Sequence, residues 1–168
     1  RICFSIILGL LVSNNANASY GKLDDTVTLS FKTSEPIQTP TASDVTISGL
    51  SGVTLTGNDN KTEWTASGTV TANASGNAAL SITVLDNAGN SSAEVTATDD
   101  ETAVTLDTTA PTLSNLVLAS TNAKDSTRYA KSGDNLTLTF TSSEAIPAPT
   151  VTLAGIAGTT VTVTVTNA

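Results

Sequence analysis

An internal repeat constrains the fold of this chain more than any other feature of its sequence. The stretch YGKLDDTVTLSFKTSEPI at residues 20–37 recurs as YAKSGDNLTLTFTSSEAI at residues 129–146, without a gap and at a spacing of 109 residues. Tyr, Lys, Asp, Thr, Leu, Phe, Ser, Glu and Ile recur in register. A chain of 168 residues has room for one domain of typical size and part of another. We therefore expect one complete repeat followed by part of a second.

The apolar segment at the start of the chain has a counterpart in the second repeat. With a gap of two residues, LLVSNNA at residues 10–16 aligns with VLASTNA at residues 117–123, in the middle of the chain, where no signal peptide can lie. The same segment has the outline of a secretory signal peptide, with one basic residue, an apolar run and small residues at Ala16 and Ala18. We favour residues 4–12 as the first strand of the first repeat, and a targeting sequence is the alternative.

Alternation of apolar and polar residues predicts β-strands. In TVTLSFK, the residues Val27, Leu29 and Phe31 alternate with polar residues, and NLTLTF repeats this pattern in the second copy. Further short alternating runs follow, separated by Gly, Asn, Asp or Ser, which favour turns. About seven short strands in about 100 residues are typical of two packed antiparallel sheets. We predict an all-β fold, specifically an immunoglobulin-like antiparallel β-sandwich.

One run of the sequence resembles a known family. WTASGTVTANASGNAALSITVLDNAGNSSAEV is similar to the second half of the bacterial immunoglobulin-like repeats of large surface adhesins and biofilm proteins, in which a strand with Trp precedes a strand that ends in a D-x-A-G-N turn. The stretch LDTTAPTL at residues 106–113 resembles the junction at which such repeats begin, whereas TDDETAV before it departs from the pattern. The resemblance implies an extracellular protein at a cell surface, built from tandem repeats. The matching turn and strand residues are Trp64, Asp86, Ala88, Gly89 and Asn90.

The predicted domains are residues 1–107, a complete immunoglobulin-like repeat, and residues 108–168, an incomplete second one. Residue 168 aligns near position 62, so the second repeat lacks counterparts of the strand with Trp64 and of the strands after it. A truncated sequence explains this simply. The alternative is completion by a strand from a neighbouring chain, as in donor-strand polymers. The predicted donor is the N-terminal strand, through Phe4, Ile6, Leu8, Leu10 and Val12.

Composition excludes several classes of function. The chain has no His, which excludes a Ser-His-Asp triad and His-ligated metal sites, and it has one Cys, which excludes an intrachain disulfide. Its 15 acidic and 7 basic residues give a net charge of −8, which argues against a nucleic-acid surface because phosphate contacts need clustered Lys or Arg. We expect no enzyme, no nucleic-acid partner and no membrane span.

The acidic residues favour a calcium site. Residues 1–109 carry twelve acidic and four basic residues, and no basic residue lies between Lys61 and Lys124. Calcium takes six to eight oxygen ligands, which loops rich in Asp supply, and such an ion between tandem repeats would stiffen their junction. The adhesin repeats that this chain resembles hold calcium in this way. A solvated acidic loop is the alternative. The candidate ligands are Asp86, Asp99, Asp100, Glu101 and Asp107.

Five triplets match the acceptor pattern for N-glycosylation, although such triplets also arise by chance in a chain rich in Asn, Ser and Thr. The candidate sites are Asn17, Asn60, Asn73, Asn90 and Asn135.

Two functions of different class fit these observations. The first is a structural module of a surface adhesin, stalk or filament, which provides reach and rigidity without catalysis. The second is the subunit of a self-assembling extracellular filament, in which a neighbouring chain completes the second repeat. The expected partners are accordingly like chains, or glycans and proteins of a cell surface.

Overall fold

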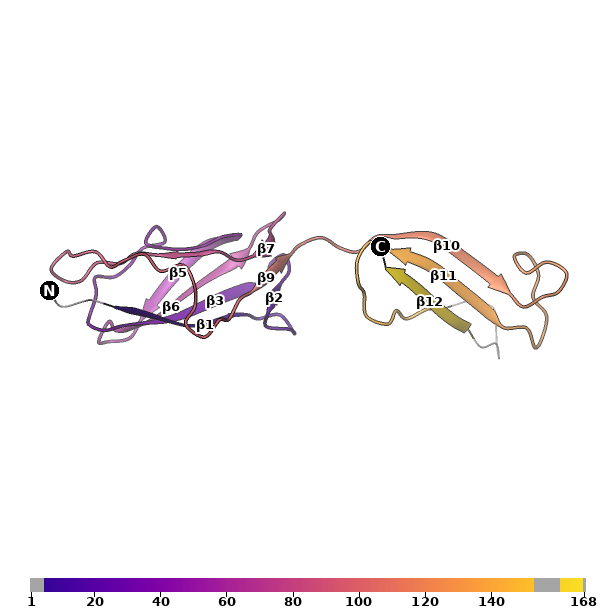
Figure 1. The fold of residues 1–168 in the computed structure, drawn as a ribbon, viewed down its shortest axis with the longest axis horizontal. Helices are drawn as coiled ribbons and strands as arrows, with labels where there is room; N and C mark the ends of the chain where they lie inside the picture. Colours follow the sequence, from indigo (N-terminus) through magenta and orange to yellow (C-terminus); the bar gives the residue numbers. More distant parts are fainter. Residues whose placement is uncertain (1–4, 153–160, 168) are drawn as a thin grey trace. The chain divides into compact units, whose positions relative to one another are not determined.

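The computed structural model describes residues 5–152 and 161–167, and every regular element in these residues is a β-strand, which confirms the all-β prediction. The chain divides into two compact units, Arg1–Thr109 (unit one) and Ala110–Ala168 (unit two) (Figure 1). Unit one contains β1 (Ile6–Ser13), β2 (Tyr20–Gly21), β3 (Thr26–Thr33), β4 (Val45–Ile47), β5 (Leu50–Gly57), β6 (Glu63–Val70), β7 (Ser75–Asn77), β8 (Leu80–Ile82) and β9 (Thr105–Asp107). Unit two contains β10 (Leu113–Ser120), β11 (Leu136–Ser142) and β12 (Val161–Asn167).

The main sheet of unit one has the strand order β1-β3-β6-β5, and all of its neighbouring strands are antiparallel. Val27, Leu29 and Phe31 of β3 are fully buried, as the alternation of the sequence predicts. Strand β6 presents Trp64 to the same interior, opposite Phe31 in the β3–β6 register. Burial of one face of each strand therefore fixes the register, because a slip of one residue would move these side chains into water.

Shorter strands cover the buried face of the main sheet. Strands β4 and β8 form an antiparallel pair, which isolated bridges extend from Ile82 to Val95 and from Ile37 to Asp86. Strands β2, β9 and β7 form a three-stranded sheet. Unit one is thus sandwich-like, with one continuous apolar core. Its buried members include Leu8, Leu11, Val27, Leu29, Phe31, Ile37, Val45, Trp64, Ile82, Val84, Val104 and Leu106.

A β-bulge interrupts β1 and changes which of its side chains face the core. Leu8 pairs with Phe31 and Leu11 pairs with Leu29, so that two residues of β1 lie opposite Ser30. The extra residue reverses the alternation of the strand beyond the bulge. Leu11 is therefore only 2% exposed, whereas its neighbour Leu10 is 48% exposed.

Unit two shares the first strand pair of unit one but continues differently. Strands β10 and β11 are antiparallel, and β10 also has a bulge, between Ser114 and Val117. This bulge lies opposite Phe140, the counterpart of Phe31, whereas the bulge of β1 lies opposite Ser30. In unit one the other edge of β3 pairs with antiparallel β6, whereas in unit two the corresponding edge of β11 pairs with β12 in parallel. The sequence pattern does not predict this parallel pairing.

The same hydrogen-bonded turn precedes β3 in unit one and β11 in unit two. In unit one, Asn15 Nδ2 donates to Asp25 Oδ2 at 2.6 Å, and the Lys22 amide donates to the same oxygen at 2.9 Å. These bonds lower the pKa of Asp25, with the Asn15 side chain as the largest cause. The corresponding residues of unit two, which make the same two bonds, are Asn122, Lys131 and Asp134.

Candidate functional site

Asp86, the first of the five predicted calcium ligands, closes its own turn. Its Oδ1 accepts the amides of Ala88 and Asn90, both at 2.8 Å, and its Oδ2 accepts Asn90 Nδ2 at 2.7 Å. The pKa of Asp86 is lowered, chiefly by the bond from the Asn90 side chain. The D-x-A-G-N stretch is therefore a turn whose carboxylate oxygens already accept three hydrogen bonds.

Asp100 and Asp107 also accept hydrogen bonds from residues close to them in the sequence. Asp100 Oδ1 accepts the hydroxyl and the amide of Thr102 at 2.7 and 3.1 Å, and the side-chain bond is the largest cause of its lowered pKa. Asp107 Oδ1 accepts the amide of Thr109, two residues further along the chain, at 3.0 Å. Glu101 is exposed and has a positive φ of 59°.

These five side chains are not brought together in the structure. Among the described residues, no three acidic, His or Cys side chains form a group that could hold a metal ion. The carboxylates of Asp86, Asp100 and Asp107 accept hydrogen bonds from residues close to them in the sequence. Asp99 instead accepts one from the Leu8 amide of β1. A charge count along the sequence does not show where each carboxylate points.

The five candidate glycosylation sites are all exposed. Asn17, Asn60 and Asn73 lie in turns or connections of unit one. Asn90 donates its side-chain amide to Asp86, so its nitrogen already has a partner within the turn. The fifth site, Asn135, immediately precedes β11 of unit two.

The predicted donor segment forms β1 and lies within its own unit. Leu8 is buried in the core, Ile6 and Val12 are partly buried, and Leu10 is exposed. Phe4 lies outside the described residues. The bulge means that the five alternating residues of the prediction do not share one face of this strand.

The first and last segments of unit one run side by side. The Leu8 amide donates to Asp99 Oδ2 at 2.7 Å, and the Asp99 amide donates to the Leu8 carbonyl at 3.1 Å. Three residues further along both segments, the Leu11 amide donates to Thr102 Oγ1 at 2.9 Å. The outer edge of β1 is therefore covered by a segment that follows it by 91 residues.

This contact continues into a parallel strand pair. The Thr105 amide donates to the Ser19 carbonyl at 2.9 Å, and β9 then pairs with β2 in parallel, with Leu106 opposite Gly21. Residue numbers increase in the same direction along both segments. We call these contacts, between residues 8–21 and residues 98–107, the terminal clamp. The distribution of acidic residues along the sequence gives no sign that Asp99 accepts a hydrogen bond from the backbone here.

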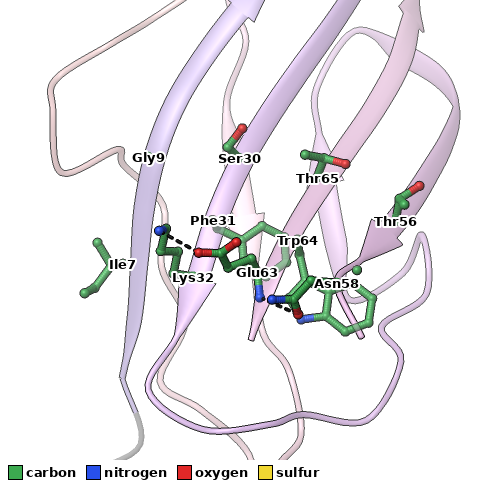
Figure 2. Close-up of a pocket in the computed structure, with 11 residues that line it drawn as sticks. Ile7, Gly9, Ser30, Phe31, Lys32, Thr56, Asn58, Glu63, Trp64 and Thr65 are labelled. Atoms are coloured by element: carbon green, nitrogen blue, oxygen red, sulfur yellow. Dashed lines mark hydrogen bonds and ion pairs between the residues drawn. The ribbon is translucent and has the colours of Figure 1, made fainter. Parts of the chain in front are cut away.

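A groove lies on the solvent face of the main sheet, and Figure 2 shows its lining. Its volume is about 450 Å³. Lys32 Nζ and Glu63 Oε1 form an ion pair at 2.7 Å on its wall, and Ser30 and Thr65 line it beside this pair. Both charged side chains are more than half exposed, so their attraction contributes little to stability. The groove therefore presents hydroxyl groups and one ion pair whose opposite charges cancel.

No family model matches the chain, and no match was found among curated proteins or solved structures. Among the described residues, no helix is long and apolar enough to cross a membrane.

Proposed function

We propose that this chain is a load-bearing structural module of an extracellular surface adhesin, stalk or filament. Its units would belong with the bacterial immunoglobulin-like repeats that the sequence resembles, and neighbouring repeats of the same kind would be its partners. The terminal clamp is the observation that carries the proposal.

The direction of the clamp decides how it responds to tension. Pulling on the two ends of unit one moves residues 8–21 and residues 98–107 in opposite directions along a shared axis. Hydrogen bonds between extended segments lie across the strands, so tension along the strands loads these bonds together. Bonds between the strands of a hairpin that is pulled apart from its open end would instead break one after another. Unit one is therefore built to resist stretching between its ends.

Single-molecule force spectroscopy tests this proposal. The chain is pulled either through the two ends of unit one or through Cys handles placed on the exposed ends of β5 and β6, across their hairpin. We expect a clearly higher unfolding force in the first geometry. Each unfolding event should lengthen the chain by up to about 3.5 Å per residue released.

The double variant Asp99→Ala and Thr102→Val removes the side-chain acceptors for Leu8 and Leu11. Each lost bond costs about 1 kcal/mol, so we expect the unfolding rate under tension to rise about tenfold or more. Asp44→Ala is the matched control, because Asp44 accepts two hydrogen bonds from Thr41 in a turn that does not belong to the clamp. Equal forces in the two pulling geometries, together with an unchanged rate in the double variant, would refute a load-bearing clamp.

A further inference from the structure

Three hydroxyl side chains lie in a row across the solvent face of the main sheet. Ser30 of β3 pairs with Thr65 of β6, and Thr65 pairs with Thr56 of β5. All three line the groove of about 450 Å³, and Figure 2 shows them on neighbouring strands. Since the strands of a sheet are about 4.8 Å apart, the row spans about 10 Å. We call these three residues the hydroxyl row.

The hydroxyl row differs from the row beside it on the same face. Two residues further along the strands, Thr28 Oγ1 and Ser67 Oγ form a hydrogen bond of 2.9 Å, and Thr54 Oγ1 donates to the Ser67 carbonyl at 3.4 Å. Within residues 5–152 and 161–167, the three hydroxyl groups of the hydroxyl row form no hydrogen bond with another protein group. Their donors and acceptors are therefore available to a ligand.

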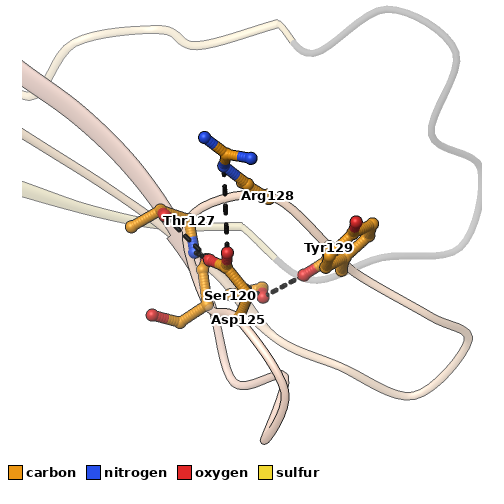
Figure 3. A network of polar contacts seen from close by, with 6 residues as sticks. Ser120, Asp125, Thr127, Arg128 and Tyr129 are labelled. Carbon is orange, nitrogen blue, oxygen red and sulfur yellow. Dashed lines mark hydrogen bonds and ion pairs between the residues drawn. The ribbon is translucent and has the colours of Figure 1, made fainter.

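Hydroxyl side chains of unit two also bond to protein groups. In the loop after β10, Ser120 Oγ donates to the Tyr129 carbonyl, as Figure 3 shows. In the same loop, Thr127 Oγ1 donates to Asp125 Oδ1 at 2.8 Å. These hydroxyl groups stabilise the loop, whereas the hydroxyl row stabilises no turn or loop of unit one.

The backbone at the floor of the groove is not available for pairing. Strand β3 lies between β1 and β6, and β6 lies between β3 and β5, so both edges of each strand are already paired. A peptide that binds by strand addition needs a free edge, and the floor has none. An aliphatic ligand would bury the hydroxyl row without hydrogen-bond partners, which costs free energy. The occupant must therefore be a molecule that pairs with side-chain hydroxyl groups.

The charges of the groove favour a neutral occupant. Lys32 and Glu63 form an ion pair of 2.7 Å on its wall, so neither an anion nor a cation finds an unpaired counter-charge there. Ile7 lines the groove as well and is 57% exposed, which adds an apolar surface. Hydroxyl groups next to an apolar surface match a sugar, because a sugar ring carries hydroxyl groups at its rim and C–H groups on its faces.

The bulge of β1 keeps the hydroxyl row accessible. It places Gly9 and Leu10 opposite Ser30. A Cβ atom on Gly9 would lie 3.3 Å from the Ser30 carbonyl oxygen and 3.9 Å from Ser30 Cβ. Any side chain at position 9 would therefore lie against Ser30 and narrow the groove. The observed volume of about 450 Å³ falls in the range of roughly 300–1,000 Å³ that is typical of sites for small ligands.

We propose that this groove is a binding site for a neutral carbohydrate of about the length of a disaccharide. The sugar hydroxyl groups would pair with the hydroxyl row, and a C–H face of the sugar would lie against Ile7. The hydroxyl row does not belong to the terminal clamp, so this proposal does not depend on the load-bearing function. The site is open and offers few hydrogen bonds, so millimolar affinity is expected.

NMR titration of the isotope-labelled full chain tests the site. The probes are three neutral disaccharides (maltose, cellobiose and diacetylchitobiose) and the anionic digalacturonate, each at millimolar concentration. At least one neutral disaccharide should shift the amide signals of Ile7 and of the hydroxyl row in a saturable way. Digalacturonate should leave these signals unchanged, because the net charge of −8 and the closed ion pair disfavour an anion.

Two valine variants separate hydrogen bonding from general effects on the sheet. Thr65→Val replaces one hydroxyl by a methyl group of similar size and should weaken the disaccharide by about threefold to tenfold, through the loss of one neutral hydrogen bond. Thr69→Val is the matched control, because Thr69 is exposed on the same face of β6 but does not line the groove, and it should leave the affinity unchanged. Both variants keep a β-branched residue, which suits a strand.

The proposal is overturned if no neutral disaccharide shifts the groove signals, or if the shifts lie elsewhere in the chain. Equal or tighter binding by Thr65→Val would also overturn it, because the groove would then select apolar ligands. Equal weakening by Thr65→Val and Thr69→Val would do the same, since the effect would not come from the groove. If Thr65→Val fails to fold, Ser30→Ala removes another hydroxyl of the row and is subject to the same criteria.

Discussion

The bulge in β1 leads to a sharp prediction about two adjacent leucines. Leu11 is 2% exposed and belongs to the core cluster, whereas Leu10 is 48% exposed. Truncating a buried leucine to alanine costs about 2–5 kcal/mol, because the lost contacts leave a cavity. We therefore expect Leu11→Ala to lower the free energy of unfolding of unit one by about 3 kcal/mol. Leu10→Ala should lower it by less than about 1 kcal/mol, since half of its side chain is in water.

Urea denaturation followed by fluorescence measures this difference. Trp64 is the only tryptophan of the chain and is buried in unit one, so its emission reports the unfolding of that unit alone. For an m-value of about 1.5 kcal/mol per molar urea, Leu11→Ala should lower the midpoint by about 2 M. Leu10→Ala should lower it by less than about 0.7 M, on the same m-value.

A regular strand without the bulge predicts the opposite order, because Leu10 would then share a face with Leu8. Equal midpoints for the two variants, or a larger effect of Leu10→Ala, would refute the register described for β1. Leu118→Ala is a further control, since it removes a leucine at the equivalent position of unit two and should leave the Trp64 transition unchanged.

Two further predictions concern charge and backbone. Hydrogen bonds lower the folded-state pKa of three carboxyl groups of unit one. The stability that these carboxylates contribute is present above their unfolded-state pKa of about 3.9, and it is lost as the pH falls through their folded-state pKa values. Since the chain has no His, the urea midpoint followed by Trp64 fluorescence should be constant from about pH 5 to pH 8 and should decrease below about pH 4. A urea midpoint that rises on acidification would contradict this. The three groups are Asp25, Asp86 and Asp100. Asp24 has a φ of 69°, and its counterpart is Gly133 with a φ of 91°, so Asp24→Gly should raise the thermal midpoint through a gain of up to about 1 kcal/mol. Asp24→Asn controls for the lost charge, and an equal rise in both variants would assign the effect to charge.

Local patterns of the sequence predicted the parts of the fold that depend on local rules. The alternation of Val27, Leu29 and Phe31 correctly placed one face of β3 in the core. The bulge of β1 could not be predicted, because the apolar run around it offers leucines in both registers and its pairing opposite Ser30 of β3 cannot be read from that run alone. Alternation is informative only where one face of a strand is clearly polar.

The candidate sites could also be predicted only in part from the sequence. The acidic window was correctly located, but the direction of each carboxylate depends on backbone turns that charge counting does not describe. Asp86 accepts hydrogen bonds within its own turn, whereas Asp99 reaches across the fold to the Leu8 amide. A contact between residues 91 positions apart has no signature in a single sequence. The terminal clamp therefore emerges only from the structure.

The second long strand of each unit, β3 or β11, pairs with a different kind of neighbour in the two units. Strand β12 pairs with β11 in parallel, whereas in unit one β6 pairs with β3 antiparallel. A ladder in either direction needs only backbone donors and acceptors. Backbone pairing alone gives little specificity. The apolar and polar alternation that β3 and β11 share therefore does not by itself determine the direction of the strand that pairs beside them.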